Sequence, residues 1–242
     1  MMLKRWDDLP AQMRTPAVRP YYDALAKKQC SLIAKRIFDI GAALVLLILL
    51  SPVFLVLAVA IKLDSPGPVF YRQTRVTQYG REFRIFKFRT MVSGADRLGA
   101  QVTVSQDARI TRVGRLIRRC RLDEISQLLN VLDGTMTFVG TRPEVPQFVA
   151  AYTPEMWATL LLPAGITSEA SILYKDEDRL LAQAGNVDDA YVNQVLPGKM
   201  RYNLYAVKHF SFWFEIRTMF RTVFAVMGKN YGDPLAENGR SN

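Results

Sequence analysis

A long uncharged stretch near the N-terminus constrains this chain more than any other feature of its sequence. Residues 40–61, IGAALVLLILLSPVFLVLAVAI, are 22 residues without a charged side chain. As one straight helix they would extend about 33 Å, which is enough to cross the hydrocarbon core of a bilayer. The simplest prediction is therefore a helix that enters a membrane.

A Ser-Pro pair lies in the middle of this stretch. Pro52 lacks an N–H and its ring collides with the carbonyl of Ile48, so the helix must kink or break there. The hydroxyl of Ser51 can partly satisfy the backbone that the proline leaves free. Proline also occurs in true spanning helices, so a kinked span is one interpretation.

The charges that flank the stretch favour a second interpretation. Basic residues precede it and follow it: Lys27, Lys28, Lys35 and Arg36 on one side, Lys62, Arg72, Arg75 and Arg81 on the other. Because basic loops stay in the cytoplasm, a re-entrant hairpin satisfies both flanks at once. A cleavable signal peptide, suggested by Ala58-Val59-Ala60, fits less well, since the apolar run starts too late and is too long.

The composition restricts the chemistry. The net charge of +10 calls for an anionic partner: nucleic acid, lipid headgroups or a phosphate-bearing substrate. Cys30 and Cys120 lie far apart and His209 is the one histidine, which argues against zinc clusters and disulfides and fits a reducing compartment. Covalent catalysis would then more naturally use a carboxylate than a Ser-His or Cys-His pair.

The remaining pattern predicts an α/β fold, mostly α with a small β-hairpin. VFYRQTRV and REFRIFKFRTM around Gly80 predict a hairpin with one cationic face, although an ordinary solvated strand pair reads the same way. We expect further elements as follows: a helical region over 115–132 broken near Leu122, a loop over 141–146, a helix over 154–162, an irregular acidic region to Gly198, and an amphipathic C-terminal helix with Trp213, Ile216, Phe220, Phe224 and Met227 near one face.

We divide the chain into four parts. These are an irregular or partly helical N-terminal extension (1–34), the re-entrant membrane helix (35–63), a catalytic domain on the cytoplasmic face (64–228) that ends in an interfacial amphipathic helix, and a C-terminal tail (229–242). A basic amphipathic helix of this kind can also lie in the plane of the headgroups.

An Asp-Glu pair follows a run of arginines. Asp123 and Glu124 come directly after a segment with six arginines, Arg109, Arg112, Arg115, Arg118, Arg119 and Arg121. The ordinary explanation is a helix start with surface ion pairs. Phosphoryl transfer, however, needs cations for phosphate, oxygen ligands for Mg²⁺ and a nucleophile, and this segment contains all three. Arg142, on a Gly-Thr-Arg-Pro loop, adds a second phosphate-binding candidate.

Four ordered blocks resemble one known family. KRIFDIGAALVLLILLSPVF, KFRTM, DARITRVGRLIRRCRLDEISQLLNVLDGTMTFVGTRPE and FSFWFEIRTMFRTV are similar to the bacterial sugar transferases, over about residues 35–226. These are monotopic enzymes that begin the assembly of surface glycans. The resemblance implies transfer of a sugar-1-phosphate from a UDP-sugar to undecaprenyl phosphate with release of UMP, at the cytoplasmic face of the inner membrane.

The resemblance also implies roles for single residues. Asp123 matches the aspartate that carries the covalent phosphosugar, and Glu124 matches the carboxylate that helps it to bind Mg²⁺. Arg118, Lys87 and Arg142 match basic positions of the active site. Lys35 and Arg36 match the entry motif, with Asp39, and would hold the lipid phosphate. Ser51-Pro52 matches the helix breaker that turns the chain back, so both ends would be cytoplasmic.

Some positions depart from the family pattern. Thr77, Thr135 and Thr141 stand where many relatives carry Gly, Asp and Pro, and LPAGITSEASILYKDE replaces a stretch that touches the sugar in relatives. Glu169, Lys175 and Asp176 are candidates for reading the sugar, or members of a surface loop. Neither the sugar, the glycan nor the oligomeric state follows from the sequence.

Two rivals from other classes stay open on the residues alone. A membrane-tethered, nonenzymatic nucleic-acid-binding protein would use the basic hairpin and the arginine segment, with salt-dependent affinity and no need for Asp123. A noncatalytic membrane scaffold would need neither. The preferred interpretation has a UDP-sugar, undecaprenyl phosphate and the bacterial membrane as partners, and no nucleic acid.

Overall fold

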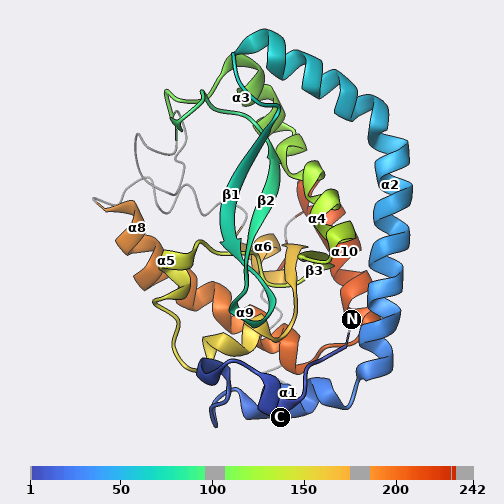
Figure 1. Cartoon of the computed structure of the whole chain (residues 1–242), viewed down its shortest axis with the longest axis vertical. Helices are drawn as coiled ribbons and strands as arrows, with labels where there is room; N and C mark the ends of the chain where they lie inside the picture. The colour runs from blue at the N-terminus through green and yellow to red at the C-terminus, as the bar shows by residue number, and fades with distance from the viewer. Residues whose placement is uncertain (1, 96–106, 175–185, 230, 233–242) are drawn as a thin grey trace.

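The computed structural model describes residues 2–95, 107–174, 186–229 and 231–232 (Figure 1). Within these ranges the chain is mostly helical, with two small sheets. Its α-helices are α1 (Arg19–Ala26), α2 (Gln29–Asp64), α3 (Arg112–Arg119), α4 (Leu128–Asp133), α5 (Pro146–Val149), α6 (Glu169–Leu173), α8 (Val187–Ala190), α9 (Leu196–Lys208) and α10 (Phe212–Val226). Its strands are β1 (Phe70–Val76), β2 (Glu82–Phe88), β3 (Met136–Val139) and β4 (Ala164–Thr167).

Helix α2 contains the Ser-Pro pair. It runs without interruption from Gln29 to Asp64, so Pro52 lies inside one helix, and the predicted kink takes the form of a bend between the blue and cyan parts of the ribbon (Figure 1). Ser51 Oγ donates to the carbonyl of Ile48, at 2.8 Å. This is the acceptor that Pro52 leaves free, which confirms the expected role of the hydroxyl.

The surface of α2 is reversed relative to a helix on a water-soluble protein. Many of its large apolar residues are exposed, as Ile48 shows at 71%, whereas the charged side chains of Lys35 and Asp39 are buried. In the described ranges α2 is the one helix long and apolar enough to cross a membrane. An exposed apolar face of this length fits association with lipid.

The predicted hairpin is present. Strands β1 and β2 pair in antiparallel register, with Tyr71 opposite Lys87 and Arg72 opposite Phe86. Side chains on opposed residues share a face. Lys87 therefore lies on one face and Arg72 on the other, and the prediction of a single cationic face is wrong because the cations do not alternate strictly along the strands.

The helical region around the Asp-Glu pair is broken, as predicted. Helix α3 ends at Arg119, a 3₁₀ helix (η5, Leu122–Gln127) follows, and α4 continues from there. Arg121, between α3 and η5, has a left-handed backbone with φ of 53°. That conformation costs a non-glycine residue roughly 1–2 kcal/mol.

In its described part, the region expected to be irregular up to Gly198 contains regular elements; its residues 175–185 lie outside the described residues. Strand β4 pairs in parallel with β3, and α6, α8, a π-helical turn (Tyr191–Val195) and the start of α9 follow. Strands β3 and β4 have only four residues each, which is too short for the alternation of a strand to be recognised in the sequence. The helix expected over 154–162 is a short 3₁₀ helix, η6 (Met156–Leu161).

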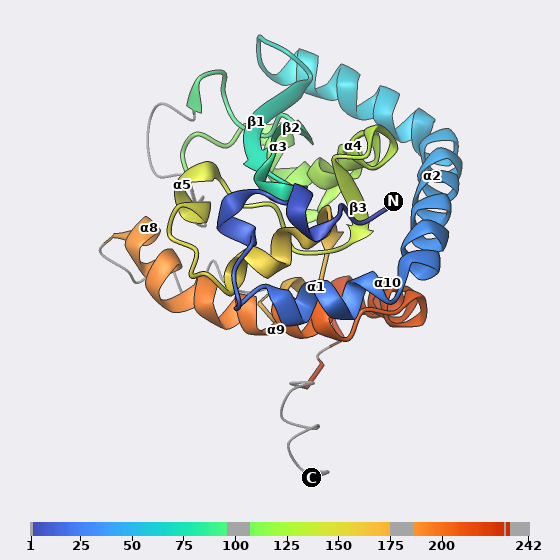
Figure 2. The ribbon, with the colours of Figure 1, turned by 60° about the horizontal axis from the view of Figure 1, so that its bottom comes forward.

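The N-terminal extension packs onto the rest of the chain as two 3₁₀ helices, η1 (Trp6–Asp8) and η2 (Ala11–Met13), and α1. Met13, Val18 and Leu25 are buried in one hydrophobic cluster with Leu196 and Met200 of α9. Figure 2 shows α1 running alongside α9. The extension is thus part of the folded unit, and the helix that follows it begins at Gln29.

Helix α10 confirms the predicted C-terminal amphipathic helix. Its polar residues Glu215 and Thr218 are buried, whereas Trp213 (77%) and Phe220 (64%) are exposed. Such an arrangement is unfavourable in water but suits a helix whose outer face meets lipid acyl chains.

Candidate functional site

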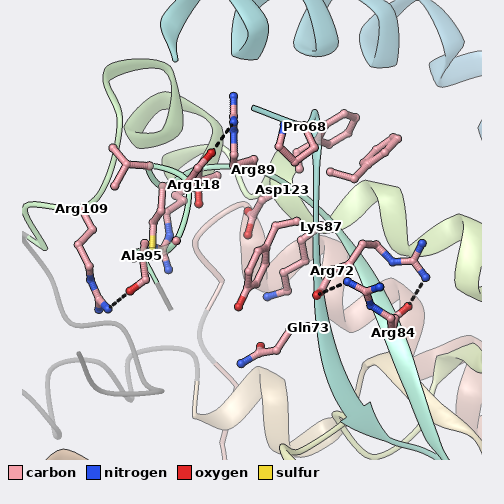
Figure 3. Close-up of a pocket in the computed structure, with 18 of the residues that line it drawn as sticks. Pro68, Arg72, Gln73, Arg84, Lys87, Arg89, Ala95, Arg109, Arg118 and Asp123 are labelled. Atoms are coloured by element: carbon pink, nitrogen blue, oxygen red, sulfur yellow. Dashed lines mark hydrogen bonds between the residues drawn. The ribbon is translucent and has the colours of Figure 1, made fainter. Parts of the chain in front are cut away.

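One pocket of about 710 Å³ is lined by five of the basic residues noted in the sequence, together with Arg84 and Arg89 (Figure 3). It lies between the β1–β2 hairpin, the segment that follows β2, and the α3–η5 junction. Among the described residues that line it, seven are cationic and one is acidic: Arg72, Arg75, Arg84, Lys87, Arg89, Arg109, Arg118 and Asp123. We call this set the basic pocket. An excess of cations around a concave surface favours an anionic ligand.

Local structure brings three of the predicted residues to this pocket. Lys87 is the second-to-last residue of β2, and Arg118 lies in the last turn of α3. Asp123 is in the first turn of η5, which begins just after the left-handed residue Arg121. In Figure 3 the carboxylate of Asp123 lies between Arg118 and Lys87.

Glu124 lies beside the pocket and is held by two cations. Lys87 Nζ donates to its Oε1 at 3.1 Å, and Arg142 contacts both of its oxygens, from Nη2 to Oε1 at 2.5 Å and from Nη1 to Oε2 at 3.2 Å. The Gly-Thr-Arg-Pro loop therefore reaches the Asp-Glu pair, as the sequence suggested. Bidentate arginine–carboxylate pairs are the most directional of ion pairs.

The two adjacent carboxylates have different electrostatic surroundings. Burial raises the pKa of Asp123, and Lys87 and Arg118 only partly oppose this. Burial acts on Glu124 in the same direction, but Arg142 and Lys87 outweigh it and hold the pKa of Glu124 well below its usual range. Within the described part of the chain, no side chain donates a hydrogen bond to the Asp123 carboxylate, and Lys87 and Arg118 act on it only through their charge. A separation of this kind assigns different tasks to two carboxylates.

Arg118 has an unused donor. Its Nη1 is buried and has no hydrogen-bond partner among the residues that the structure describes. A buried guanidinium nitrogen without a partner costs free energy, which an oxyanion in the pocket would recover.

Lys35 and Arg36 do not line the basic pocket, and their contact with the lipid phosphate stays a prediction. Lys35 is buried, where it forms ion pairs with Glu215 and with Asp39 (3.6 Å) and donates to the carbonyl of Val139. Arg36 donates to the carbonyls of Val131 (2.6 Å) and Leu132 (3.1 Å), where it satisfies the C-terminal end of α4. Both residues join α2 to the rest of the fold.

Glu169, one of the candidate sugar readers, does not line the basic pocket either. Glu169 is buried and accepts from Thr218 Oγ1 (2.7 Å) and pairs with Arg221 (2.9 Å), so it links α6 to α10. Lys175 and Asp176 lie outside the described residues. Arg84 and Arg89 also line the pocket: Arg84 was signalled in the sequence only by the basic character of the hairpin, and Arg89 only as a member of the KFRTM block.

Comparison with known proteins decides the family. A model of the family described as bacterial sugar transferase matches residues 30–229. The chain belongs to this family. The match begins at the start of α2 and ends just after α10, so the N-terminal extension precedes it.

Three relatives show the range within the family. The chain is 38% identical over 197 residues, 80% of its length and 43% of the relative, to a UDP-N-acetylgalactosamine-undecaprenyl-phosphate N-acetylgalactosaminephosphotransferase of Aeromonas hydrophila. It is 35% identical over 217 residues, 88% of its length and 44% of the relative, to a UDP-glucose:undecaprenyl-phosphate glucose-1-phosphate transferase of Escherichia coli.

A third relative, from Caulobacter vibrioides and named for the same activity as the Escherichia coli protein, is 37% identical over 194 residues, 78% of this chain and 68% of the relative. The chain thus spans less than half the length of the first two relatives and about two thirds of the third. These family members are named for two different sugars, so membership of the family does not fix the donor.

Proposed function

We propose that this protein is a phosphoglycosyl transferase that moves a sugar-1-phosphate from a UDP-sugar to undecaprenyl phosphate, an initiating step of bacterial surface glycan synthesis. The names of its relatives support the two substrates, and one further relative, of Rhizobium leguminosarum, is named for exopolysaccharide production. The basic pocket supports an anionic donor with more than one phosphate group.

The mechanism rests on the opposite pKa shifts of the two adjacent carboxylates, upward at Asp123 and downward at Glu124. A carboxylate with less charge compensation than its neighbour is the better nucleophile, and the raised pKa of Asp123 beside the lowered pKa of Glu124 supports this role for Asp123. In the first step an Asp123 oxygen attacks the phosphorus next to the sugar. The bond from that phosphorus to the bridging oxygen breaks, and UMP leaves with the electron pair.

The second step returns the enzyme to its starting state. An oxygen of the lipid phosphate attacks the same phosphorus, the bond to Asp123 breaks, and the sugar-diphosphate lipid is released with Asp123 again a carboxylate. Because UMP departs first, the two anionic substrates never have to react with each other directly. Arg118, Lys87 and Arg142 would hold phosphate oxygens, and the bidentate pairing of Arg142 with Glu124 would fix the geometry beside Asp123.

We propose Mg²⁺ as the cofactor. The protein would supply only part of the ligands for this ion. Asp123 offers carboxylate oxygens at the pocket, and the described residues contain no group of three or more side chains that could hold a metal ion. Mg²⁺ commonly binds through one or two carboxylates together with substrate phosphates, so Asp123, Glu124 and the donor would hold it jointly. When bound, it would neutralise charge on the diphosphate.

We further propose that α2 enters the membrane from the cytoplasmic face and returns to it. The bend at Pro52, the exposed apolar faces of α2 and α10 and the basic residues on both flanks support this placement. The division into extension, membrane helix, catalytic domain and tail belongs to the same proposal.

Two exposed cysteines allow a direct test of the topology. Cys30 lies at the start of α2 and Cys120 at the end of α3. In spheroplasts of a bacterium that expresses the protein, an impermeant maleimide should leave both unlabelled until the cells are lysed. Labelling of one of the two before lysis would establish a spanning helix instead.

The activity is tested with purified protein in a bilayer. UDP-sugars are supplied one at a time with Mg²⁺ and undecaprenyl phosphate, and release of UMP is measured. At least one donor should give UMP and a lipid-linked product. A nucleic-acid-binding protein or a scaffold would give none, and the former would bind nucleic acid with a steep salt dependence.

A further inference from the structure

Arg89 closes the C-terminal end of α2 against the wall of the basic pocket. Its guanidinium is buried and donates to backbone carbonyls at the end of the helix and in the turn beyond it: Pro66 at 2.6 Å, Ser65 at 2.7 Å and Ile61 at 3.4 Å. The last carbonyls of a helix lack partners within the helix, and a planar fork can satisfy several at once. Arg89 therefore ties α2 to the strand end that also carries Lys87.

Gly67 shows how closely the chain wraps around this guanidinium. A Cβ at this position would lie 2.1 Å from Arg89 Nη1 and 2.4 Å from Ser93 Oγ, and φ is +125°. Only glycine adopts such a backbone without strain. The turn after α2 is thus shaped around the Arg89 side chain.

Asp64, the last residue of α2, makes a second connection. Its Oδ2 accepts from the amide of Val113 at 2.9 Å, in the first turn of α3. Hydrogen bonds from the Thr111 side chain and this amide lower the pKa of Asp64. A carboxylate at a helix N-terminus satisfies an otherwise free N–H and interacts favourably with the helix dipole. Helix α3 carries Arg118 at its other end.

Apolar contacts reinforce the same junction. Phe88, between Lys87 and Arg89, packs edge-on against Phe54 of α2 with ring centroids 5.1 Å apart. Ile117, the neighbour of Arg118, is buried in one cluster with Phe88 and Ile61. Along this extended segment Lys87 and Arg89 project to the same side, since side chains alternate.

We propose that Arg89 and Asp64 form a clamp through which the end of α2 positions Lys87 and Arg118 around Asp123. The clamp makes the arrangement of the pocket depend on the seating of the membrane helix. Arg89 and Asp64 are positioning residues here, because they act through Lys87 and Arg118. The functional part of this inference rests on the proposed function, and the structural part does not.

Two substitutions weaken the clamp and have matched controls. Arg89→Lys keeps the positive charge but loses the planar guanidinium that contacts three carbonyls. Asp64→Ala removes the carboxylate that accepts from the amide of Val113. Arg19→Lys and Asp23→Ala make the same changes in an exposed ion pair within α1, at 3.0 Å, far along the chain from the pocket residues. Since one ammonium cannot reach the three carbonyls, Arg89→Lys should release the end of α2 without unfolding the protein.

Hydrogen exchange tests the clamp without any activity. In bilayer discs, Arg89→Lys should speed amide exchange in the last turn of α2, Asp64→Ala should speed it in the first turn of α3, and the α1 controls should leave both segments unchanged. Unchanged exchange in both clamp variants would overturn the inference. This outcome is independent of whether the protein makes UMP.

Turnover tests the positioning. Arg89→Lys should lower kcat/KM about tenfold or more, while the controls stay within about twofold of the wild type. Positioning predicts non-additivity: Lys87→Ala with Arg89→Lys should be little worse than Lys87→Ala alone. The positioning role would be overturned if the loss of kcat/KM in the double variant equalled the product of the two single losses. Normal turnover in Arg89→Lys would also overturn it. Absence of UMP from the wild-type protein would count against the proposed function and leave the exchange result standing.

Discussion

Arg142 grips Glu124 with both arms of its guanidinium, at 2.5 Å and 3.2 Å, although the two residues are 18 positions apart in the chain. The pair joins the Gly-Thr-Arg-Pro loop to the Asp-Glu segment and occupies both oxygens of Glu124. Asp123, the next residue along, keeps its carboxylate at the basic pocket. The fold thus distinguishes two acids that the sequence presents side by side.

Asp123→Asn should abolish turnover, by about 10³-fold or more, because an amide cannot form the covalent intermediate. The variant should still enter the membrane with an unchanged melting temperature. UMP release measures the loss, and intact-protein mass spectrometry of the wild type with donor alone should detect the added sugar-phosphate. Asp23→Asn, on the exposed face of α1, is the matched control and should keep full activity.

Arg142→Lys should reduce kcat/KM about 10- to 100-fold, since an ammonium cannot replace a bidentate fork on Glu124. The cost should grow further in Arg142→Ala, where Glu124 loses its largest stabilising charge. Steady-state kinetics with varied donor concentration measures both. Wild-type kinetics in Arg142→Lys would show that the loop does not contribute to the site.

Glu215 predicts a pH dependence of stability with an unusual sign. Burial raises its pKa from 4.5 to about 7, only partly opposed by Lys35, and Asp39 adds to the rise. The folded state therefore binds more protons than the unfolded state between these values, so stability should fall as pH rises from about 4.5 to about 7 and level off above that.

The free energy of unfolding should fall by up to about 3 kcal/mol over this pH range, because one pKa unit corresponds to about 1.4 kcal/mol. Thermal unfolding of the protein in detergent across this range measures it, and Glu215→Gln should flatten the profile in the same buffers. A profile that keeps its slope in Glu215→Gln would assign the dependence to other groups.

Phe220→Glu should weaken membrane binding, because this side chain is exposed on the apolar face of α10 and a charge there cannot enter the acyl region. Sedimentation with liposomes after a high-salt wash measures the bound fraction. Met2→Glu changes another exposed apolar residue, in the N-terminal extension, and should have no effect. Equal binding of both variants would show that α10 does not lie against lipid.

Gly114→Ala should cost about 2–4 kcal/mol of stability, because the new Cβ would lie 2.0 Å from the backbone carbonyl oxygen of Thr90. Gly41→Ala is the comparison, since no atom lies within 4 Å of the Cβ it would add to helix α2. It should be neutral or slightly stabilising. Thermal unfolding of both variants measures the difference, and equal stability would contradict the close packing of α3.

The sequence by itself determined the features that depend on neighbouring residues. The uncharged run with its Ser-Pro pair, the hairpin around Gly80, the break before the Asp-Glu pair and the amphipathic helix near the C-terminus are all written in local patterns. The blocks of family resemblance are equally local, and the family match confirmed them.

Only the tertiary structure decided which charged residues are free to act. The sequence shows Lys35 and Arg36 only as two neighbouring basic residues, whereas the fold pairs each with groups 95 or more positions away. Lys35 contacts Glu215 and Val139, and Arg36 contacts Val131 and Leu132. Arg89 is likewise committed to the end of α2, whereas Asp123 is left available. Buried charges must find partners wherever the fold places them, and no local pattern records such distant pairings.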